Sequence, residues 1–295
     1  MKNIDMTMTT TSKYSYFPGC SLATTAKENN ASLIGFFKRM GIELDELPDW
    51  NCCGSSSIHC IDTNLSIMLA ARNLALAPAG MPLLVACPNC LLRLKTAQLK
   101  IAEDKELRAQ YEQNLGRPFD PDLKIYHVFD LLDQIGRNGF ANRIIKRLDG
   151  LRVAAYYGCM LSRPPALRHE KRHNLLMENI LEQTGAQSVQ WSNASRCCGT
   201  FLSVVHPELV TTMVNDIHLA ASAAGADCIV TACAMCHLNL EVRCALPSPV
   251  PILHFSELLA LSVGDPKPDK WFSRHLIDPL PLFRSKIMKK DTRKV

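Results

Sequence analysis

The stretch DWNCCGSSSIHC, residues 49–60, places two cysteines next to each other in front of a glycine. Neighbouring cysteines rarely form a disulfide with each other, because their Cα atoms lie too close and the ring is strained. They also do not sit easily as two ligands on one tetrahedral zinc. An adjacent pair of thiols therefore needs another explanation, and the rest of the chain indicates which.

The same pair recurs 145 residues later, as RCCG at 196–199, within a cysteine pattern that the chain contains twice. Both copies read C-x(n)-C-C-G-x(m)-C-x-x-C, with n of 31 and 37 and m of 32 and 33. The flanks repeat as well, since IYHVFDLL (125–132) matches ILHFSELL (252–259). An internal repeat of this length predicts two tandem homologous domains. The first copy contains Cys20, Cys52, Cys53, Cys87 and Cys90, and the second contains Cys159, Cys197, Cys198, Cys233 and Cys236.

Each group of cysteines follows a segment with the composition of a β-strand, and helical patterns lie between these segments. In the first copy, strands are predicted at 13–17, 42–47 and 82–86, and helices at 23–40, at 63–77 and from Cys90 to about 113. In the second copy, strands are predicted at 151–157, 187–191 and 228–232, and helices at 167–184, at 207–223 and after Cys236.

This alternation predicts the α/β class, with parallel sheets joined by right-handed βαβ crossovers. We expect two such domains at 13–140 and 150–264, related by a pseudo-twofold axis, with a disordered leader at 1–12 and a basic, disordered tail at 265–295. Open parallel sheets bind their ligands at the carboxyl ends of the strands. Five thiols from three loops are therefore expected to converge in each half, as a metal site requires.

The composition sets limits on the class of protein. The chain has 295 residues, a formal net charge of +5 and scattered Lys and Arg, which does not predict binding to nucleic acid. No run approaches the about 18 apolar residues of a membrane span, and the start lacks the features of a secretion signal. We therefore expect a cytoplasmic protein, at most peripheral at a membrane through its partners, whose thirteen cysteines stay reduced.

The donor set favours iron–sulfur chemistry. A structural zinc site with four cysteines usually has two CxxC pairs, and the C-x₂-C-x₂-C-x₃-C-P run of cubane clusters is absent. Five soft thiolates in each half indicate an iron–sulfur centre of unusual shape, in which adjacent cysteines bind neighbouring irons or bridge them. Arg93, Arg163 and Arg196 lie near the cysteines in sequence, and cations there would raise the reduction potential. Gly54 and Gly199 are expected at a positive φ or close to the cluster.

The pattern resembles the cysteine-rich CCG domain, and two in tandem resemble the B subunit of heterodisulfide reductase. YFPGCSL, LPDWNCCG and the valine-containing strand before CPNC carry this resemblance, which spans roughly residues 13–262. The resemblance implies a non-cubane [4Fe-4S] cluster in each domain. It assigns the five cysteines of the first copy to one cluster and the five of the second copy to the other.

The resemblance also implies an oxidoreductase subunit that is active only within a complex. Electrons would arrive from a ferredoxin-like iron–sulfur subunit and a flavoprotein subunit, because the chain has no cubane motif and no G-x-G-x-x-G of its own. The two clusters, facing each other across the pseudo-twofold axis, would cleave a disulfide substrate, or form one from thiols, in two one-electron steps.

Two alternatives stay open. One is an electron-transfer or anchor subunit of a succinate or fumarate:quinone oxidoreductase, or of a lactate or glycolate oxidase-type complex. The other is a zinc scaffold, which the fifth cysteine of each half disfavours.

Five further residues invite an interpretation. His127 and His254 occupy equivalent repeat positions and are weak candidates for supplying a proton, although a packing or capping role is favoured. Cys60, Cys228 and Cys244 have no counterpart in the other repeat, and buried thiols explain them best.

Overall fold

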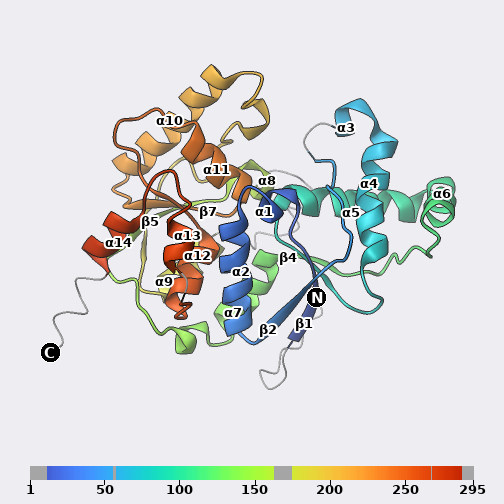
Figure 1. Ribbon diagram of the computed structural model, residues 1–295, viewed down its shortest axis with the longest axis horizontal. Helices are drawn as coiled ribbons and strands as arrows, with labels where there is room; N and C mark the ends of the chain where they lie inside the picture. The colour runs from blue at the N-terminus through green and yellow to red at the C-terminus, as the bar shows by residue number, and fades with distance from the viewer. Residues whose placement is uncertain (1–11, 56–57, 163–174, 267, 288–295) are drawn as a thin grey trace. The chain divides into compact units, whose positions relative to one another are not determined.

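The computed structural model describes residues 12–55, 58–162, 175–266 and 268–287 (Figure 1). The chain divides into two compact units. One consists of Met1–Cys20 and Ile34–Val128, and the other of Ser21–Leu33 and Phe129–Val295. The short segment after Cys20 therefore packs with the second repeat, although it belongs to the first repeat in sequence.

The first unit contains a four-stranded sheet in the order β2-β1-β3-β4. Every neighbouring pair in it is parallel, and Tyr16 of β1 lies opposite Glu46 of β2 and Leu84 of β3. The strands are β1 (Ser12–Phe17), β2 (Ile42–Glu46), β3 (Leu83–Val85) and β4 (Ile125–His127).

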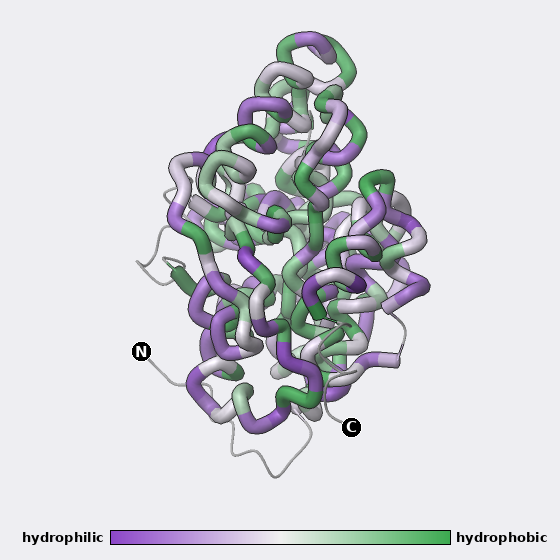
Figure 2. Tube along the Cα trace, turned by 90° about the vertical axis from the view of Figure 1, so that its left-hand side faces the viewer, coloured by the Kyte–Doolittle hydropathy of each residue, from purple (hydrophilic) through white to green (hydrophobic). Residues whose placement is uncertain are grey.

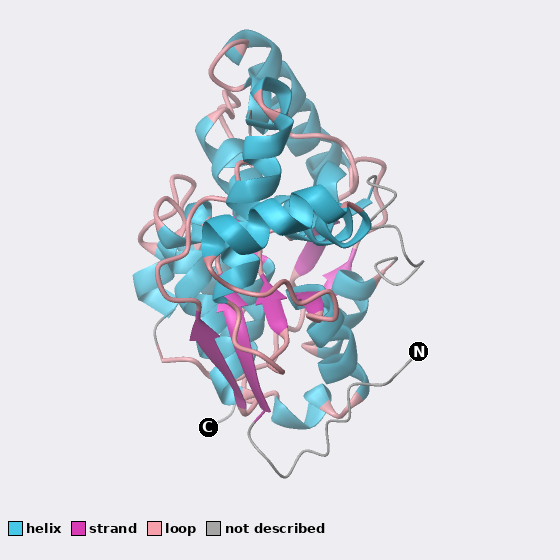
Figure 3. Ribbon diagram, turned by 90° about the vertical axis from the view of Figure 1, so that its right-hand side faces the viewer, coloured by secondary structure: helices cyan, strands magenta, loops and turns pink. Residues whose placement is uncertain are grey.

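The second unit repeats this topology, with a parallel sheet in the order β6-β5-β7-β8. Figure 3 distinguishes the strands from the helices around them. Its strands are β5 (Arg152–Tyr156), β6 (Gln187–Ser188), β7 (Cys228–Thr231) and β8 (Ile252–His254). Two parallel sheets with interleaved helices confirm the predicted α/β class and its two tandem repeats. The predicted strand at 187–191 is shorter than expected, because only its first two residues pair with β5.

The central strands are apolar at successive positions, as expected of parallel strands that are buried on both faces. Leu83, Leu84 and Val85 of β3 are fully buried, and so are Ile229 and Val230 of β7. Along the helices, hydrophilic and hydrophobic residues alternate, as expected of elements with one face toward a core (Figure 2).

The helices before the second repeat's first strand are α1 (Cys20–Ala23), α2 (Lys27–Arg39), α3 (Ile58–Ile61), α4 (Thr63–Leu76), α5 (Pro88–Glu103), α6 (Lys105–Leu115) and α7 (Val128–Arg137). The long helix predicted after Cys90 is thus two helices. The chain breaks at Asp104, whose side chain accepts hydrogen bonds from the amides of Glu106 and Leu107 and so starts α6 as its N-cap.

The later helices are α8 (Gly158–Ser162), α9 (Leu176–Gln183), α10 (Pro207–Ala223), α11 (Ala234–Val242), α12 (Phe255–Ser262), α13 (Pro268–Phe272) and α14 (Leu280–Lys286). The prediction for 207–223 matches α10 at both ends. Much of the helix predicted at 167–184 falls outside the described residues, and α9 is the part that lies within them.

The expectation of a disordered tail is wrong for the residues that form α13 and α14. Trp271, Phe272 and Phe283 are almost fully buried, and the rings of Phe272 and Phe283 stack with centroids 4.7 Å apart. Burial of these three aromatic side chains favours an ordered segment. The leader up to residue 11 and the last eight residues lie outside the described chain.

Candidate metal centres

Three strand ends bring the cysteines of the first copy together. Cys20 starts α1 just after β1, and the Cys52–Cys53 pair lies in the loop after β2. Cys87 is the N-cap of α5 after β3, and Cys90 lies in the first turn of that helix. The Sγ atoms of Cys20 and Cys52 are 3.8 Å apart, and those of Cys53 and Cys90 are 3.1 Å apart. Sequence-distant thiols thus meet at one edge of the sheet.

The second copy has the same arrangement. The Sγ atoms of Cys159 and Cys197 are 3.7 Å apart, and those of Cys198 and Cys236 are 3.4 Å apart. Cys233 is the N-cap of α11, as Cys87 is of α5. The strand order explains the repetition, because the outer strand and the two central strands of each sheet end side by side and each delivers part of the set.

Glycines directly before Cys20 and Cys159 make room for the sulfurs. Gly19 has a φ of +78°, and a Cβ built on it would lie 2.9 Å from the Cys90 Sγ. Gly158 has a φ of +68°, and its Cβ would lie 3.2 Å from the Cys236 Sγ. Neither glycine was singled out from the sequence, although PGC and YGC in matching positions were a signal that could have found them.

Gly54 and Gly199 of the CCG motifs have φ values of +73° and +78°, so the predicted positive φ is confirmed. The sequence also predicted that these glycines lie close to a cluster, but their nearest neighbours are side chains of the following helices. A Cβ on Gly54 would meet Leu69, and one on Gly199 would meet Val210 and Met213. These glycines let the CCG loops pack on the helices that follow them.

Side-chain hydrogen bonds fix the CCG loop of each copy. In the second copy, the Asn239 amide donates to the carbonyl oxygen of Cys198 at 2.7 Å, and the Tyr156 hydroxyl donates to that of Arg196 at 2.5 Å. In the first copy, the Asn73 amide donates to the carbonyl oxygen of Asn51 at 2.9 Å, and its Oδ1 accepts from the amide of Asn51 at 2.9 Å. Different residues thus hold two loops of the same kind.

The thiols influence one another's ionisation. Hydrogen bonding with the thiols of Cys20 and Cys53 lowers the pKa of Cys52, and its contact with Cys52 raises the pKa of Cys20. In the second copy, hydrogen bonding with Cys236 lowers the pKa of both Cys198 and Cys233, and the same contacts raise the pKa of Cys236. In each group, cysteines with a lowered pKa thus lie next to cysteines with a raised pKa. A polynuclear metal centre would take the place of the thiol protons.

One sulfur pair in each copy has the spacing of two thiolates on one metal. Disulfide bonds are about 2.05 Å long, so the sulfurs of these pairs lie too far apart to be bonded to each other. Two thiolates on one tetrahedral metal, each about 2.3 Å from it, lie about 3.7 Å apart. The Cys20–Cys52 and Cys159–Cys197 distances of 3.8 and 3.7 Å agree with that value.

The other residues singled out from the sequence have varied surroundings. Arg196 pairs with Asp216 at 2.9 Å on the exposed surface, and Arg163 lies outside the described residues. The Arg93 Nε is buried and has no hydrogen-bond partner among the described residues.

His127 and His254 are both buried. His127 Nε2 lies 3.2 Å from the carbonyl oxygen of Ala86, next to Cys87, and His254 Nδ1 lies 2.7 Å from the Ser256 hydroxyl. These contacts suit the packing or capping role, and a role in proton supply stays a prediction.

Of the three unmatched cysteines, Cys228 is fully buried as expected, and Cys244 is partly buried. Cys60 is exposed, so the expectation of a buried thiol is wrong there. Its position in the four-residue helix α3, which has no buried residue, explains the difference.

Comparison with known families supplies the decisive observation. The model of the cysteine-rich domain named CCG matches this chain twice, at residues 14–95 and 153–241. The chain belongs to the cysteine-rich CCG domain family. The two matched segments contain the two groups of five cysteines, so the family resemblance of the sequence is confirmed.

Relatives of this CCG protein cover most of its length. The 8-methylmenaquinol:fumarate reductase membrane anchor subunit of Wolinella succinogenes is 30% identical, over 92% of this chain and 99% of that protein. The B subunit of the ferredoxin/F(420)H(2)-dependent CoB-CoM heterodisulfide reductase of Methanosarcina acetivorans is 27% identical, over 85% of this chain and 89% of that protein.

A solved structure of a hypothetical protein from Helicobacter pylori superposes with a TM-score of 0.71 at 14% identity, over 90% of this chain. The present chain spans 52% of that chain, and the likeness shows the fold alone.

The matched domains and relatives confirm the prediction of an iron–sulfur redox subunit similar to the B subunit of heterodisulfide reductase. They also support an oxidoreductase role within a complex of several subunits. Among the described residues, no helix is both long and apolar enough to span a bilayer.

Proposed function

We propose that this CCG protein holds two non-cubane [4Fe-4S] clusters, one in each repeat, and mediates disulfide/thiol redox chemistry within a heterodisulfide reductase-like complex. The observation that carries the proposal is the placement of five cysteines at three strand ends in each unit, where two pairs of sulfurs in each group lie 3.1–3.8 Å apart. In the first copy the ligands would be Cys20, Cys52, Cys53, Cys87 and Cys90, and in the second Cys159, Cys197, Cys198, Cys233 and Cys236.

When bound, such clusters supply electrons one at a time at a potential set by their surroundings. Cleavage of a disulfide consumes two electrons and two protons and releases two thiols. The chain's own residues set access to each centre. Cys20 and Cys52 are exposed, whereas Cys53 and Cys90 are buried behind them, so a disulfide would approach the first centre from the Cys20–Cys52 side. In the second copy, the corresponding Cys159 and Cys197 are only partly exposed.

The electrons would be delivered by partner subunits, a ferredoxin-like iron–sulfur protein and a flavoprotein. The relatives named as subunits of multi-subunit reductases support this arrangement. We propose that the complex works in the cytoplasm, with any membrane contact made through its partners.

Metal analysis of anaerobically purified protein tests the proposal. We expect about eight irons and about eight inorganic sulfides per chain, the content of two four-iron clusters. Electron paramagnetic resonance should show a signal that appears or disappears on oxidation or reduction. Zinc bound to cysteine in place of iron, or protein without labile sulfide, would rule the proposal out.

A second candidate is favoured by the fumarate reductase relative, which is matched over 99% of its length. In that case the chain would be the electron-transfer or anchor subunit of a quinone-linked succinate or fumarate oxidoreductase. Purification of the native complex separates the two candidates. A complex that reduces fumarate with a menaquinol analogue supports the second candidate, and one that reduces a mixed disulfide of two thiols supports the first.

A further inference from the structure

A group of buried titratable side chains in the second unit contains none of the ten proposed cluster ligands, although His237 directly follows Cys236. His237 and Glu241 lie one turn apart on α11, and His275 follows α13 in the C-terminal tail. His275 Nδ1 is 3.1 Å from Glu241 Oε1, and His237 Nε2 is 3.7 Å from the same oxygen. All three donor atoms lie within 4.8 Å of one another. The three side chains are 0–4% exposed, which shields the group from bulk water.

The donor set and its spacing fit a zinc ion. Two ligands of a tetrahedral zinc, each about 2.0–2.1 Å from the metal, lie about 3.4 Å apart. The two distances to Glu241, 3.1 and 3.7 Å, lie on either side of that value. Two histidines and one glutamate form a set that zinc uses where a fourth position stays open for another ligand.

The second nitrogen of each imidazole has the partner that a metal-binding histidine requires. His275 Nε2 lies 2.9 Å from Glu257 Oε1, which would orient the ring and leave Nδ1 for the metal. His237 Nδ1 lies 2.9 Å from the side-chain amide of Asn29, a fully buried residue whose Oδ1 has no partner among the described residues. The oxygen and nitrogen positions of the Asn29 side-chain amide can be exchanged by a half-turn of the amide group. Turning the amide gives Oδ1 a donor in the His237 Nδ1–H and leaves Nε2 free to bind a metal.

The charge balance points to a divalent cation. Glu241 and Glu257 are both buried, and their carboxylates lie 3.1 and 2.9 Å from the two ring nitrogens of His275. Two buried carboxylates are costly unless positive charge is placed beside them. A zinc ion held by Glu241 and the two neutral imidazoles would balance both carboxylates.

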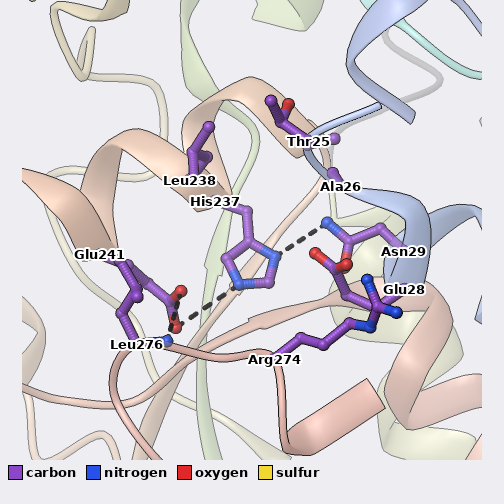
Figure 4. Close-up of a pocket in the computed structure, with 10 residues that line it drawn as sticks. Thr25, Ala26, Glu28, Asn29, His237, Leu238, Glu241, Arg274 and Leu276 are labelled. Atoms are coloured by element: carbon purple, nitrogen blue, oxygen red, sulfur yellow. Dashed lines mark hydrogen bonds and ion pairs between the residues drawn. The ribbon is translucent and has the colours of Figure 1, made fainter. Parts of the chain in front are cut away.

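A cavity of about 300 Å³ adjoins the group and is lined by His237 and Glu241 together with Asn29, Glu28 and Arg274 (Figure 4). Figure 4 shows His237 between Asn29 and Glu241, with contacts to both. A metal held by His237 and Glu241 would therefore have one side open to a space large enough for water or a small anion.

We propose that His237, Glu241 and His275 form a zinc site whose fourth position faces this cavity. The site lies outside the proposed cluster ligands and does not depend on the proposed function. It would fasten the C-terminal tail, through His275, to α11, which also carries Cys236. The two histidines bind through Nε2 of His237 and Nδ1 of His275, and Glu241 binds through Oε1.

Zinc analysis of the full-length, cluster-containing protein tests this assignment. The protein is incubated anaerobically with one equivalent of zinc sulfate, desalted and measured by mass spectrometry and zinc-edge X-ray absorption. We expect one zinc per chain, with nitrogen and oxygen neighbours at about 2.0–2.1 Å rather than sulfur at about 2.3 Å. Less than a tenth of an equivalent of zinc, or a sulfur shell, would overturn the proposal.

Variants test the ligands. Glu241→Gln keeps the side-chain volume and should lower zinc retention at least tenfold, with iron and sulfide unchanged as the check that the fold is intact. Asn29→Ala removes an outer partner and should weaken zinc binding by about 10–100-fold. His218→Gln is the matched control, because His218 is a fully buried histidine that contacts the carbonyl oxygen of Leu240 and is not one of the three proposed ligands. Full zinc retention in both Glu241→Gln and Asn29→Ala would contradict the site.

Discussion

The two repeats bring one pair of equivalent thiols to nearly the same spacing although the surroundings differ. The Cys20–Cys52 and Cys159–Cys197 distances agree within 0.1 Å, at 3.8 and 3.7 Å. Yet Cys20 and Cys52 are exposed and their counterparts are only partly so. Strand order and cysteine spacing thus determine where the sulfurs lie, and the residues around them determine how open each centre is.

The two repeats also differ in the helix that holds the CCG loop by hydrogen bonds. Three residues after the second cysteine of the CxxC pair, α11 has Asn239, which bonds to the Cys198 carbonyl. The equivalent position of α5 is Arg93, whose Nε is buried without a hydrogen-bond partner in the described part of the chain. The first repeat relies instead on Asn73 of α4 to hold its CCG loop. The second loop is therefore tied to the helix that carries Cys233 and Cys236, and the first loop is tied to another helix.

The largest expected effect comes from removing one ligand in either repeat. Cys53→Ser and Cys198→Ser should each lower iron and sulfide to about half, near four of each per chain, because one of two clusters is lost. Loss of disulfide reduction by the assembled complex should follow in both. The measurement is iron and sulfide content with the electron paramagnetic resonance signal of each variant.

Cys60→Ser is the control for these variants, since Cys60 is exposed and lies in the short helix α3. It should retain all the iron. If Cys53→Ser or Cys198→Ser kept the full complement of iron and sulfide, the assignment of that residue as a ligand would be wrong.

Exposure should make the two centres differ in their stability toward oxygen. Cys20 and Cys52 are exposed at the first centre, whereas Cys159 and Cys197 are half-buried at the second. Thiolates that oxidants can reach react fastest. In Cys198→Ser, which keeps only the first cluster, bleaching in air should be several times faster than in Cys53→Ser. Equal rates, or the reverse order, would show that exposure of these two cysteines does not control cluster loss.

Much of this architecture was predictable from the sequence, because the repeated cysteines lie directly after strands of clear composition. The parallel sheets and the ten cysteines followed from that local pattern. The tail did not, because the order of Trp271, Phe272 and Phe283 depends on the core that covers them. The grouping of His237, Glu241 and His275 was likewise hidden. The two histidines are 38 residues apart in sequence, and only the folding of the tail back onto α11 brings them together.

Glycine substitutions compare how closely the backbone approaches sulfur in the two repeats. Gly19→Ala places a Cβ 2.9 Å from Cys90 Sγ, and Gly158→Ala places one 3.2 Å from Cys236 Sγ. Gly41→Ala is the control, because Gly41 has the same φ of +78° as Gly19 and no atom within 4 Å of its Cβ position. All three should lose about 1–2 kcal/mol of stability from the left-handed backbone. Gly19→Ala and Gly158→Ala should also lose iron, Gly19→Ala more so.

Thermal unfolding and iron content of the three glycine variants check this order. Iron loss in Gly41→Ala as large as in Gly19→Ala would mean that backbone strain, and not contact with the sulfur, disturbs the centre.

Asn239→Ala tests the support of the second CCG loop. It should cost about 1–3 kcal/mol, because the Cys198 carbonyl and the Ser203 hydroxyl both lose a buried partner. Denaturant unfolding should show this loss, and the iron signal of the second centre should broaden while that of the first is unchanged. Asn73→Ala is the mirror experiment and should affect the first centre alone. A variant that disturbs both centres equally would argue against separate support.

The smallest expected loss of stability comes from removing an ion pair at the start of a central strand. Lys13 and Asp45 are both 46% exposed, whereas Asp227, the partner of Arg152 and Lys286, is 10% exposed. Burial works to raise the pKa of Asp227, but hydrogen bonds from Arg152 and Lys286 outweigh it and lower that pKa. Asp227→Asn should therefore cost about 1 kcal/mol, and Asp45→Asn should have no measurable effect because water screens its pair.

The lowered pKa of Asp227 also fixes the pH dependence of this loss. A carboxyl whose pKa is lower in the folded than in the unfolded chain stabilises the fold above its unfolded pKa of about 3.9, and this contribution disappears as the pH falls through the folded value. Melting temperatures of the protein and of Asp227→Asn, measured from pH 5 to 8, should thus differ by a constant amount. A difference that grows as the pH falls from 6 to 5 would place the folded pKa of Asp227 above its ordinary value and contradict the ion pair.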